Sequence, residues 1–206
     1  MSVEPGPAGG PTPIGYPFRP ELPIRTARLV LRPWRALDAD DLATFREMFA
    51  DPGIVRFLYG DVLGPEEAAV RLAERSPELT GEGRWMNLAV EVADSGVVAG
   101  EVGLTWTADA HGQAEIGYSF TRAHRGFGYA TEAAAALVDL AVTTLGAHRV
   151  CGRLDARNHA SARVLERLGM RHEAHLVENE WVKGEWSDEA IYAVLAREWA
   201  ERRPAG

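Results

Sequence analysis

The hydrophobic period of this chain changes once near its middle, and that change restricts the possible folds more than any other feature. Before it come three strand-like stretches, Trp85–Ala93, Val97–Thr107 and Gln113–Thr121. The turns between them fall at Asp94-Ser95-Gly96 and His111-Gly112. Short turns join neighbouring antiparallel strands, so these stretches predict a meander. From Gly128 to Gly146 the apolar residues instead follow the spacing of a long amphipathic helix.

The flanking sequence adds further strands and helices. On the N-terminal side we expect a strand at Ala27–Trp34, a helix capped by Asp38 and a helix at Gly64–Ser76. After the long helix we expect a strand, a helix and two more strands, at His148–Ala156, Asn158–Leu168, Met170–Val182 and Ser187–Ala196. A meander followed by alternating strands and helices predicts an α/β (mixed α+β) fold, with one mostly antiparallel mixed sheet and helices on both faces.

Length and composition predict a single folded domain. The chain has 206 residues, of which 46% are hydrophobic and 25% are charged, so it can bury one sizeable core. Residues 1–23 are rich in Pro and Gly and show no apolar period, which predicts an arm that is disordered or lies on the surface. The domain itself is expected to cover residues 24–200, without internal repeats.

Composition also disfavours several classes of protein. No apolar run approaches the roughly 20 residues that span a bilayer, and the N-terminus does not resemble a signal peptide. A single cysteine, Cys151, excludes an internal disulfide framework and fits a reducing cytoplasm. The net charge of −8 argues against a nucleic-acid partner and weakly favours a cationic substrate. We therefore expect a cytoplasmic protein with neither membrane nor nucleic-acid contacts.

The stretch Arg125–Ala133, RGFGYATEA, places two glycines and an arginine at the start of the long helix. Gly126 and Gly128 can adopt positive φ, which lets backbone N–H groups face a ligand at close range. The helix N-terminus adds unpaired N–H groups and a positive dipole end, and Arg125 adds a charge. The pattern predicts a diphosphate site, although a turn that needs glycine for its geometry alone remains the alternative.

Two familiar nucleotide loops do not fit this stretch. A P-loop has Lys-Ser/Thr after its last glycine, where this chain has Tyr129-Ala130. A dinucleotide fingerprint has a third glycine where Thr131 stands, and it belongs to the first unit of a parallel sheet rather than to the end of a meander.

The loop and its surroundings resemble the GNAT superfamily of N-acetyltransferases. RGFGYA fits the pattern Arg/Gln-x-x-Gly-x-Gly/Ala of that family's acyl-CoA loop. Other matching stretches follow in the expected order between Arg25 and Arg197: TARLVLRPW, GEVGLTW, AEIGYSFTRAHRGFGYATEA, NHASARVLERLGM and ENEWVKGEWSDEAIYAVL. These stretches resemble the branch that acetylates ribosomal-protein N-termini and that branch's many relatives.

This resemblance implies the GNAT fold, acetyl-CoA as cosubstrate and an amine acceptor. It assigns cofactor binding to Phe120, Arg125, Gly126, Phe127, Gly128, Tyr129, Ala130, Thr131, Asn158 and Ser161. The strand Glu115–Phe120 is expected to bulge, so that a backbone N–H near Phe120 polarises the thioester carbonyl. As side chains, Tyr118 and Phe120 are expected to pack in the strand.

The helix that begins NHAS carries two of these residues. From the residues alone, Asn158 is a common N-cap and Ser161 is unremarkable in a first turn. The resemblance adds that Asn158 bonds the pantetheine and that the Ser161 hydroxyl lies near the CoA sulfur, where it would protonate the leaving thiolate.

The general base has two candidates, Glu180 and Glu115. The resemblance points to Glu180, while a solvated charge in an acidic hairpin is the alternative. Strand alternation places Glu178, Glu180 and Val182 on one face and Asn179 with Trp181 on the other. Glu115 is the rival because it lies on the central strand. An α-amine, with a pKa of about 8, needs less help from a base than lysine at about 10.4.

Other reactive groups are expected to be structural. Cys151 lies in an apolar strand, which predicts a buried thiol. His172 and His175 point to opposite faces of a strand, so we predict no metal site. Trp181 and Trp186 fit either the wall of an acceptor site or packing within their hairpin.

Together these features predict an acyltransferase that moves an acetyl group from acetyl-CoA to a primary amine by direct attack in a ternary complex. The acceptor is a protein N-terminal α-amine or a small-molecule amine. A transferase for another acyl-CoA, such as succinyl-CoA, and a catalytically silent acyl-CoA-binding module are the alternatives. A monomer or homodimer is expected.

Overall fold

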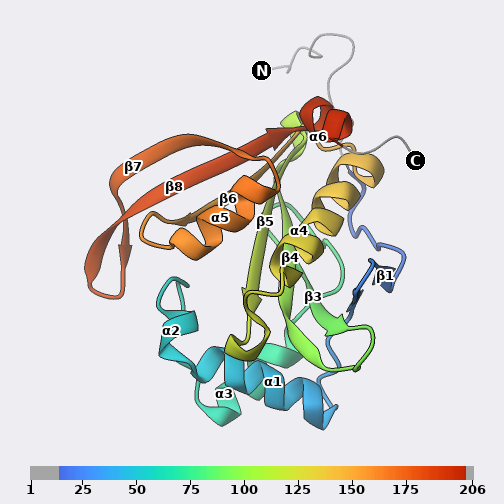
Figure 1. Cartoon of the computed structure of the whole chain (residues 1–206), viewed down its shortest axis with the longest axis vertical. Helices are drawn as coiled ribbons and strands as arrows, with labels where there is room; N and C mark the ends of the chain where they lie inside the picture. The colour runs from blue at the N-terminus through green and yellow to red at the C-terminus, as the bar shows by residue number, and fades with distance from the viewer. Residues whose placement is uncertain (1–13, 203–206) are drawn as a thin grey trace, which may run out of the picture.

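The computed structural model describes residues 14–202, in which helices flank an eight-stranded sheet (Figure 1). The strands lie across the sheet in the order β1-β2-β3-β4-β5-β6-β8-β7. Their bounds are β1 Ile24–Arg25, β2 Leu29–Arg32, β3 Trp85–Val92, β4 Val98–Ala108, β5 Gln113–Phe120, β6 Arg149–Asp155, β7 Arg171–Val182 and β8 Glu185–Leu195. The helices are α1 Ala39–Ala50, α2 Pro52–Val55, α3 Pro65–Ala73, α4 Tyr129–Asp139, α5 His159–Arg167 and α6 Ala196–Arg202.

The sheet is antiparallel except between β5 and β6. These two strands run parallel, whereas every other neighbouring pair in the described chain runs antiparallel. A parallel pair needs a crossover, and α4 provides it because it lies between β5 and β6 in the chain. The predicted mostly antiparallel mixed sheet and the meander β3-β4-β5 are therefore confirmed.

Helices cover both faces of the sheet, as predicted. Along β3, Leu88 and Val90 belong to a large core that includes apolar residues of α4, whereas Ala89 between them belongs to a second core with residues of α1 and α3. Figure 1 shows α4 and α5 in front of the sheet, with α1 and α3 at its lower end.

The predicted helix starts are confirmed by their caps. Asp38 Oδ1 accepts hydrogen bonds from Asp40 N and Asp41 N, both at 3.0 Å, at the start of α1. Asn158 Oδ1 accepts from Ser161 N at 3.1 Å at the start of α5. Each cap satisfies backbone donors that the first turn of a helix leaves unpaired.

Two short α-helices, α2 and α6, lie outside the sequence prediction. The four-residue helix α2 is too short to show a hydrophobic period, and Asp51 Oδ1 caps it by accepting from Gly53 N at 2.8 Å. A π-helical turn at Leu140–Thr144 closes the long helix, and α6 follows β8 without a loop. The predicted strand at Ala27–Trp34 is shorter in the structure, where β2 covers Leu29–Arg32.

Residues 14–23, the described part of the predicted arm, lie against the domain. Phe18 N donates to Leu79 O at 2.9 Å, and Leu79 N donates back to Phe18 O at 3.1 Å. Ile14, Tyr16 and Leu22 pack, partly buried, against the large core. The rest of the predicted arm, residues 1–13, falls outside the described residues.

Candidate active site

The central strands β5 and β6 part after three residue pairs. Their parallel pairing joins Gln113 to Arg149, Ala114 to Val150 and Glu115 to Cys151. On its other edge β5 stays paired with β4 as far as Phe120. The edge of β5 beyond Glu115 is therefore not paired with β6, and a gap opens in the middle of the sheet.

The backbone groups along this free edge follow from the register with β4. Thr121 N donates to Ala99 O at 3.0 Å, which makes Thr121 and Ala99 a hydrogen-bonded pair of the antiparallel ladder. Such pairs alternate with pairs whose N–H and C=O groups point away from the partner strand. Tyr118 and Phe120 belong to the second kind, so their N–H groups point into the gap. The register from Ala114 to Phe120 is continuous, so the predicted bulge in this strand was wrong: the separation of β5 from β6 exposes the backbone instead.

The glycine-rich loop enters α4 beside the gap. Gly126 and Gly128 have φ of 85° and 83°, in the left-handed region that favours glycine, and Gly128 is the residue before the helix. Nearby, the hydroxyl of Thr131 in the first turn of α4 is buried, and it has no hydrogen-bond partner among the described residues. An acceptor oxygen of a bound phosphate would satisfy the free N–H groups of the helix end.

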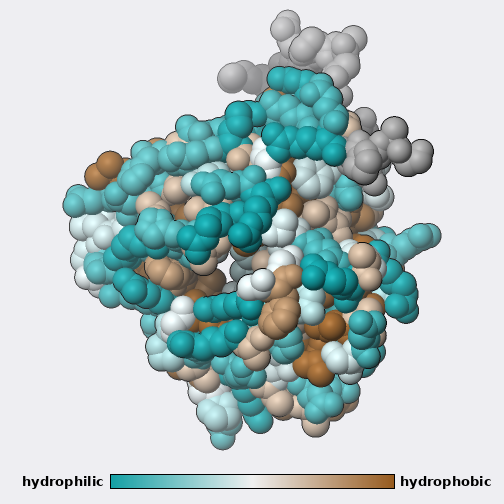
Figure 2. Space-filling model, in the orientation of Figure 1, coloured by the Kyte–Doolittle hydropathy of each residue, from teal (hydrophilic) through white to brown (hydrophobic). Residues whose placement is uncertain are grey.

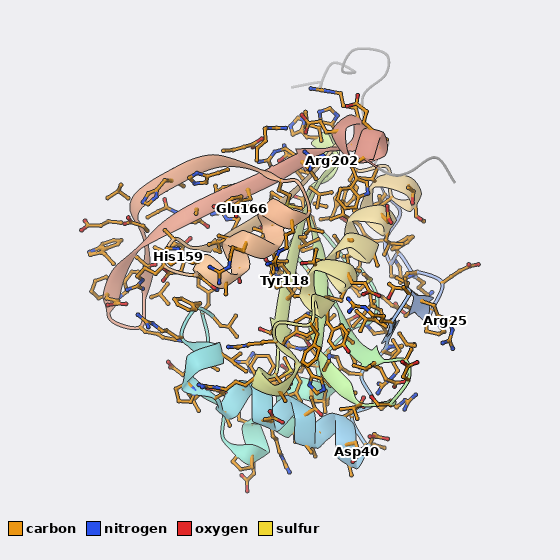
Figure 3. The ribbon with its side chains drawn as sticks, viewed as in Figure 1. Arg25, Asp40, Tyr118, His159, Glu166 and Arg202 are labelled. Atoms are coloured by element: carbon orange, nitrogen blue, oxygen red, sulfur yellow. The ribbon has the colours of Figure 1, made fainter. Side chains whose placement is uncertain are left out.

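On the opposite side of the gap lies the N-terminus of α5. Tyr118 Oη donates to the backbone carbonyl of Ser161 at 2.9 Å, which ties β5 to the first turn of α5. Burial raises the pKa of Tyr118 above its ordinary value, so its phenol is neutral at physiological pH. Figure 3 shows Tyr118 beneath α5, with His159 at the start of that helix.

These elements line a cavity of about 410 Å³, which we call the donor cavity. Figure 2 shows this face hollowed near its centre, between α5 and the glycine-rich loop. Of the residues that the sequence assigns to the cofactor, all but Phe127 line the donor cavity. Phe127 is 58% exposed and stacks on Tyr129, with ring centroids 5.5 Å apart. The cavity volume lies in the range of small-molecule and cofactor sites.

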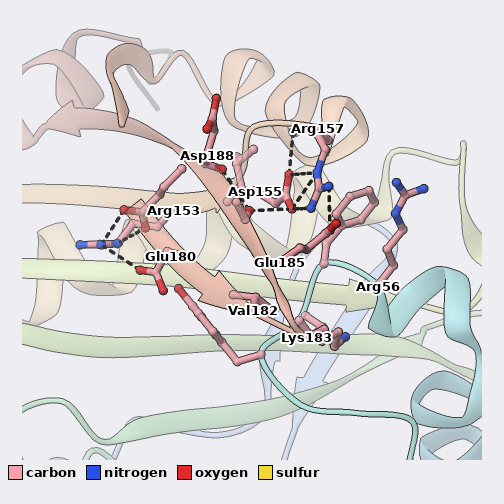
Figure 4. A pocket seen from close by; sticks show the side chains of 15 residues that line it. Arg56, Arg153, Asp155, Arg157, Glu180, Val182, Lys183, Glu185 and Asp188 are labelled. Atoms are coloured by element: carbon pink, nitrogen blue, oxygen red, sulfur yellow. Dashed lines mark hydrogen bonds and ion pairs between the residues drawn. The ribbon is translucent and has the colours of Figure 1, made fainter. Parts of the chain in front are cut away.

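A smaller cavity of about 70 Å³, the acceptor cavity, adjoins the first one. Phe57 and Leu58, which follow α2, line both cavities, so the two meet at these residues. The other walls of the acceptor cavity come from β6 and from the β7–β8 hairpin (Figure 4). Lys183 at the hairpin tip donates to Val55 O at the end of α2 at 2.5 Å and so connects the two walls.

The two cavities differ in charge. The donor cavity is lined by Arg125, Arg163 and Arg167, and no carboxylate is present among its described lining residues. The acceptor cavity is lined by five carboxylates and four cations: Asp155, Glu180, Glu185, Asp188 and Glu189, with Arg56, Arg153, Arg157 and Lys183. The donor cavity therefore suits an anion, although the chain as a whole carries a net charge of −8.

Arg153 is the centre of an ion-pair network in the acceptor cavity (Figure 4). Its guanidinium makes two hydrogen bonds to the Glu189 carboxylate, at 2.7 and 2.8 Å, and lies 4.0 Å from Glu180. Asn179 Nδ2 also donates to Glu189, at 2.9 Å. The alternation that places Asn179 on the face opposite Glu180 was therefore wrong. A bulge between Leu176 and Glu180, with Glu178 at φ 47°, turns the Asn179 side chain towards the same carboxylate.

The two predicted bases lie in different settings. Glu180 is partly exposed and lines the acceptor cavity. Glu115 is the last residue of β5 that pairs with β6, and it does not appear among the described lining residues of either cavity. Burial raises the pKa of Glu115 to about 6; Arg153 acts to lower that pKa and Glu189 to raise it.

Glu189 is a residue that the sequence prediction missed. It is 2% exposed and holds both Arg153 and Asn179. The available signal is a carboxylate directly before the apolar run AIYAVL, since a carboxylate that is buried with such a run needs a cationic partner. The sequence does not name that partner because Arg153 is on another strand, where it pairs with Ile191.

The remaining reactive side chains are not among the described lining residues of either cavity. Trp181 and Trp186 pack edge to face, with centroids 5.3 Å apart, and both are mostly exposed outside the described cavity linings. Cys151 is buried, as predicted, and burial raises the pKa of its thiol to about 11. His175 pairs with Asp188 at 2.7 Å. Within residues 14–202, no group of three or more His, Cys, Asp or Glu side chains could hold a metal ion.

Comparison with known proteins finds a family whose model matches this chain. A family model described as an acetyltransferase (GNAT) domain matches residues 28–171. The chain is 29% identical over 177 residues to the uncharacterized N-acetyltransferase p20 of Bacillus licheniformis, covering 86% of this chain and 98% of that protein.

Solved structures share the fold. One is called a probable acetyltransferase of the GNAT family from Chromobacterium violaceum; it is 29% identical, with a TM-score of 0.78, over 97% of this chain and 98% of its own. Another is a spermidine N-acetyltransferase from Vibrio cholerae in complex with CoA and spermine. It is 21% identical, with a TM-score of 0.66, over 85% of this chain and 99% of its own, which shows the shared fold alone.

Proposed function

Since this chain belongs to the GNAT family of acetyltransferases, we propose that it transfers an acetyl group from acetyl-CoA to a primary amine. The observation that carries the proposal is the gap between β5 and β6. It exposes the N–H groups of Tyr118 and Phe120 beside a glycine-rich helix N-terminus, within a cavity lined by arginines and no described carboxylate.

The donor cavity supplies groups for each part of the cosubstrate. The loop amides from Arg125 to Ala130, with the Thr131 hydroxyl, would bind the diphosphate. The free edge of β5 would pair with the pantetheine arm, which carries amide groups of its own, and Asn158 lies across the gap from that edge. A backbone N–H at Phe120 would then donate to the thioester oxygen, where negative charge develops during transfer.

The acceptor cavity suits an amine that arrives as a cation. Its carboxylates attract an ammonium group, and the contact of the two cavities at Phe57 and Leu58 brings that amine towards the thioester. Arg153 balances Glu189, which leaves Glu180 as the less tightly held carboxylate near the network. The small volume of this cavity fits the reacting end of an acceptor rather than a whole molecule.

The reaction needs two proton transfers. The neutral amine nitrogen forms a bond to the acetyl carbon, and the carbon–sulfur bond then breaks to release CoA as thiol. We assign removal of the amine proton to Glu180, directly or through water, with Glu115 as the alternative. The Ser161 hydroxyl is assigned to proton donation to the departing sulfur. Glu115 has a pKa of about 6, which suits a base near neutral pH, whereas Glu180 lines the cavity that the amine would enter.

The test is release of CoA thiol from acetyl-CoA by the full chain with a panel of acceptors. The panel contains peptides with a free α-amine, the same peptides with a blocked N-terminus, and diamines and polyamines. We expect turnover with at least one free amine and none with its blocked form. Faster turnover with succinyl-CoA would replace the acetyl assignment. CoA binding without turnover on any amine would indicate a binding module instead.

Location and assembly belong to the same proposal. Among residues 14–202 no helix has the length and apolar character needed to cross a membrane. We infer a cytoplasmic enzyme that acts as a monomer or homodimer, with neither nucleic acid nor membrane as partner. Cell fractionation and light scattering of the purified chain test these two statements.

A further inference from the structure

Arg28, just before β2, reaches the glycine-rich loop from outside the donor cavity. Its Nε donates to Glu132 Oε2 at 2.7 Å, and its terminal NH2 group lies 2.7 Å from the same oxygen. Its other terminal nitrogen donates to the backbone carbonyl of Phe127 at 2.9 Å. One guanidinium therefore connects the first turn of α4 to the peptide bond between Phe127 and Gly128.

The contact with the Phe127 carbonyl fixes the direction of the next N–H group. In a planar trans peptide the C=O of one residue and the N–H of the following residue point in opposite directions. Arg28 is absent from the described lining of the donor cavity, whereas Gly128 belongs to it. Because Arg28 holds the Phe127 carbonyl outside, the Gly128 N–H is turned towards the cavity. Glycine rotates easily at positive φ, so this peptide needs such an anchor more than an ordinary one does.

Side-chain packing reinforces this arrangement. The Arg28 guanidinium lies over the Tyr129 ring, 5.0 Å from its centroid, and the Phe127 ring stacks on Tyr129 as well. A Cβ at Gly128 would meet the Arg28 terminal nitrogen at 3.5 Å, which shows how closely the side chain approaches the loop backbone.

The same arginine also offsets an unfavourable charge. Glu132 lies in the first turn of α4, close to the helix end proposed to bind a diphosphate, where a bare carboxylate would repel it. Thr26 Oγ1 and Arg28 N both donate to Glu132 Oε1, at 2.6 and 2.8 Å. Partial burial opposes ionisation of Glu132, but these hydrogen bonds outweigh it and lower the pKa of Glu132 below its ordinary value. Glu132 thus stays charged and is neutralised by Arg28.

We propose that Arg28 is a positioning residue for the diphosphate of the cosubstrate, acting through the Phe127 carbonyl and Glu132 without touching the ligand. The proposal rests on the proposed function, since it needs acetyl-CoA in the donor cavity. It assigns to the β1–β2 segment, far from the loop in sequence, the task of orienting the loop's central N–H.

The test compares Arg28→Met and Arg28→Lys with Arg25→Met in the full chain. Arg25 is a matched control because it lies on β1 in the same segment and is directed away from the body of the molecule (Figure 3). Affinity for CoA is measured by calorimetry, and KM and kcat are measured with acetyl-CoA. We expect both Arg28 variants to bind CoA about tenfold more weakly, because lysine cannot supply the forked donors that reach both partners. KM for acetyl-CoA rises while kcat at saturation stays near that of the wild type, and Arg25→Met changes neither.

Three results would overturn the proposal: unchanged CoA affinity in Arg28→Met, wild-type affinity in Arg28→Lys, or a loss of kcat with KM unchanged. If Arg28→Met does not fold, Arg28→Lys at an unchanged melting temperature decides the matter. Failure of the proposed function is distinguishable, because then the wild-type chain itself does not bind CoA.

Discussion

The two cavities of this protein are formed by different kinds of chemical group. The donor cavity depends on the backbone: two glycines at positive φ, a helix N-terminus and the free edge of β5. The acceptor cavity depends on charged side chains from three separate parts of the chain, several of them held by ion pairs with Arg153 and Arg157. Backbone groups are available to any sequence that folds this way, whereas each carboxylate of the acceptor cavity is one substitution from being lost. A single change should therefore weaken the donor side gradually and the acceptor side sharply.

The charges support the same division. The donor cavity has arginines and no described carboxylate, as an anionic cosubstrate requires, while the acceptor cavity has a slight excess of carboxylates. If the proposed function holds, the two substrates would be sorted by charge before any contact with the reacting atoms. A shared wall at Phe57 and Leu58 then brings them together.

The largest effect is expected on the acceptor side, from Glu180→Gln. If Glu180 accepts the amine proton, kcat should fall by about 10²–10⁴-fold while CoA affinity stays near that of the wild type. Raising the pH should restore much of the rate, because the acceptor then loses its proton without help. Steady-state kinetics across pH, with calorimetry for CoA, measure these quantities.

Glu178→Gln is the matched control for this prediction, since Glu178 is an exposed acid two residues away outside the described cavity linings. A raised KM for the amine with unchanged kcat would make Glu180 an attractor of the cationic acceptor rather than the base. Wild-type kcat at every pH would transfer the role to Glu115.

On the donor side the sharpest change is Thr131→Val, because it removes one hydroxyl at nearly constant volume. The Thr131 hydroxyl is buried without a partner in the described chain, so its loss should not destabilise the fold. If it donates to a phosphate oxygen, CoA affinity should fall by roughly 10- to 100-fold, the size expected for a hydrogen bond to a charged group.

Thr105→Val provides the control, since the Thr105 hydroxyl is likewise buried and unpartnered but lies outside the described donor lining. Equal CoA affinity in both variants would remove Thr131 from the diphosphate site and weaken the backbone-plus-hydroxyl description of the donor cavity.

The same division decides what the sequence can predict. The meander, the long helix from Gly128 and the loop follow from local patterns, because turns, caps and hydrophobic periods are properties of neighbouring residues. The glycine-rich loop and the helix N-terminus beside the donor cavity could therefore be predicted from the residues, whereas Phe120, Asn158 and Ser161 were assigned through the resemblance to a family. The separation of β5 from β6 could not be predicted, because it depends on how two strands far apart in the chain diverge. A bulge in β5 was expected in its place.

The acceptor cavity shows the opposite case. Glu189 was missed because its partner, Arg153, lies on another strand, and nothing near either residue predicts the pair. Asn179 was placed on the wrong face because alternation fails at a bulge whose position depends on pairing with β8. The four-residue helix α2, which precedes the wall that joins the cavities, is too short to leave a pattern.

A smaller effect is expected on the stability of the fold, and it concerns Glu115. Burial raises the folded-state pKa of Glu115 from an ordinary 4.5 to about 6. The folded chain therefore binds a proton that the unfolded chain has released, and stability falls as pH rises from about 4.5 to 6. Glu115→Gln should remove this loss and stabilise the protein by about 1–2 kcal/mol above pH 6, with little difference below pH 4.5. Denaturant unfolding at several pH values measures the difference, and a destabilised variant at pH 7.5 would show that the Glu115 charge is favourable in the fold.

The smallest effect is expected in the donor cavity, at Ser161. Two hydrogen bonds from other side chains end on the Ser161 main chain: Ser161 N donates to Asn158 Oδ1 and Ser161 O accepts from Tyr118 Oη, so Ser161→Ala keeps them. The variant tests the hydroxyl alone. A thiol with a pKa of about 8.5 leaves readily as thiolate, so the gain from a proton donor should be no more than about tenfold in kcat, below the usual range of acid–base catalysis. KM for acetyl-CoA should barely change, because a donor to the leaving group acts mainly in the transition state.

Tyr118→Phe serves as the companion variant, since it removes the contact to Ser161 O while leaving the hydroxyl of Ser161 in place. A rise in KM without a loss of kcat in Ser161→Ala would assign the hydroxyl to binding the pantetheine, and the donor cavity would then contribute binding but no proton.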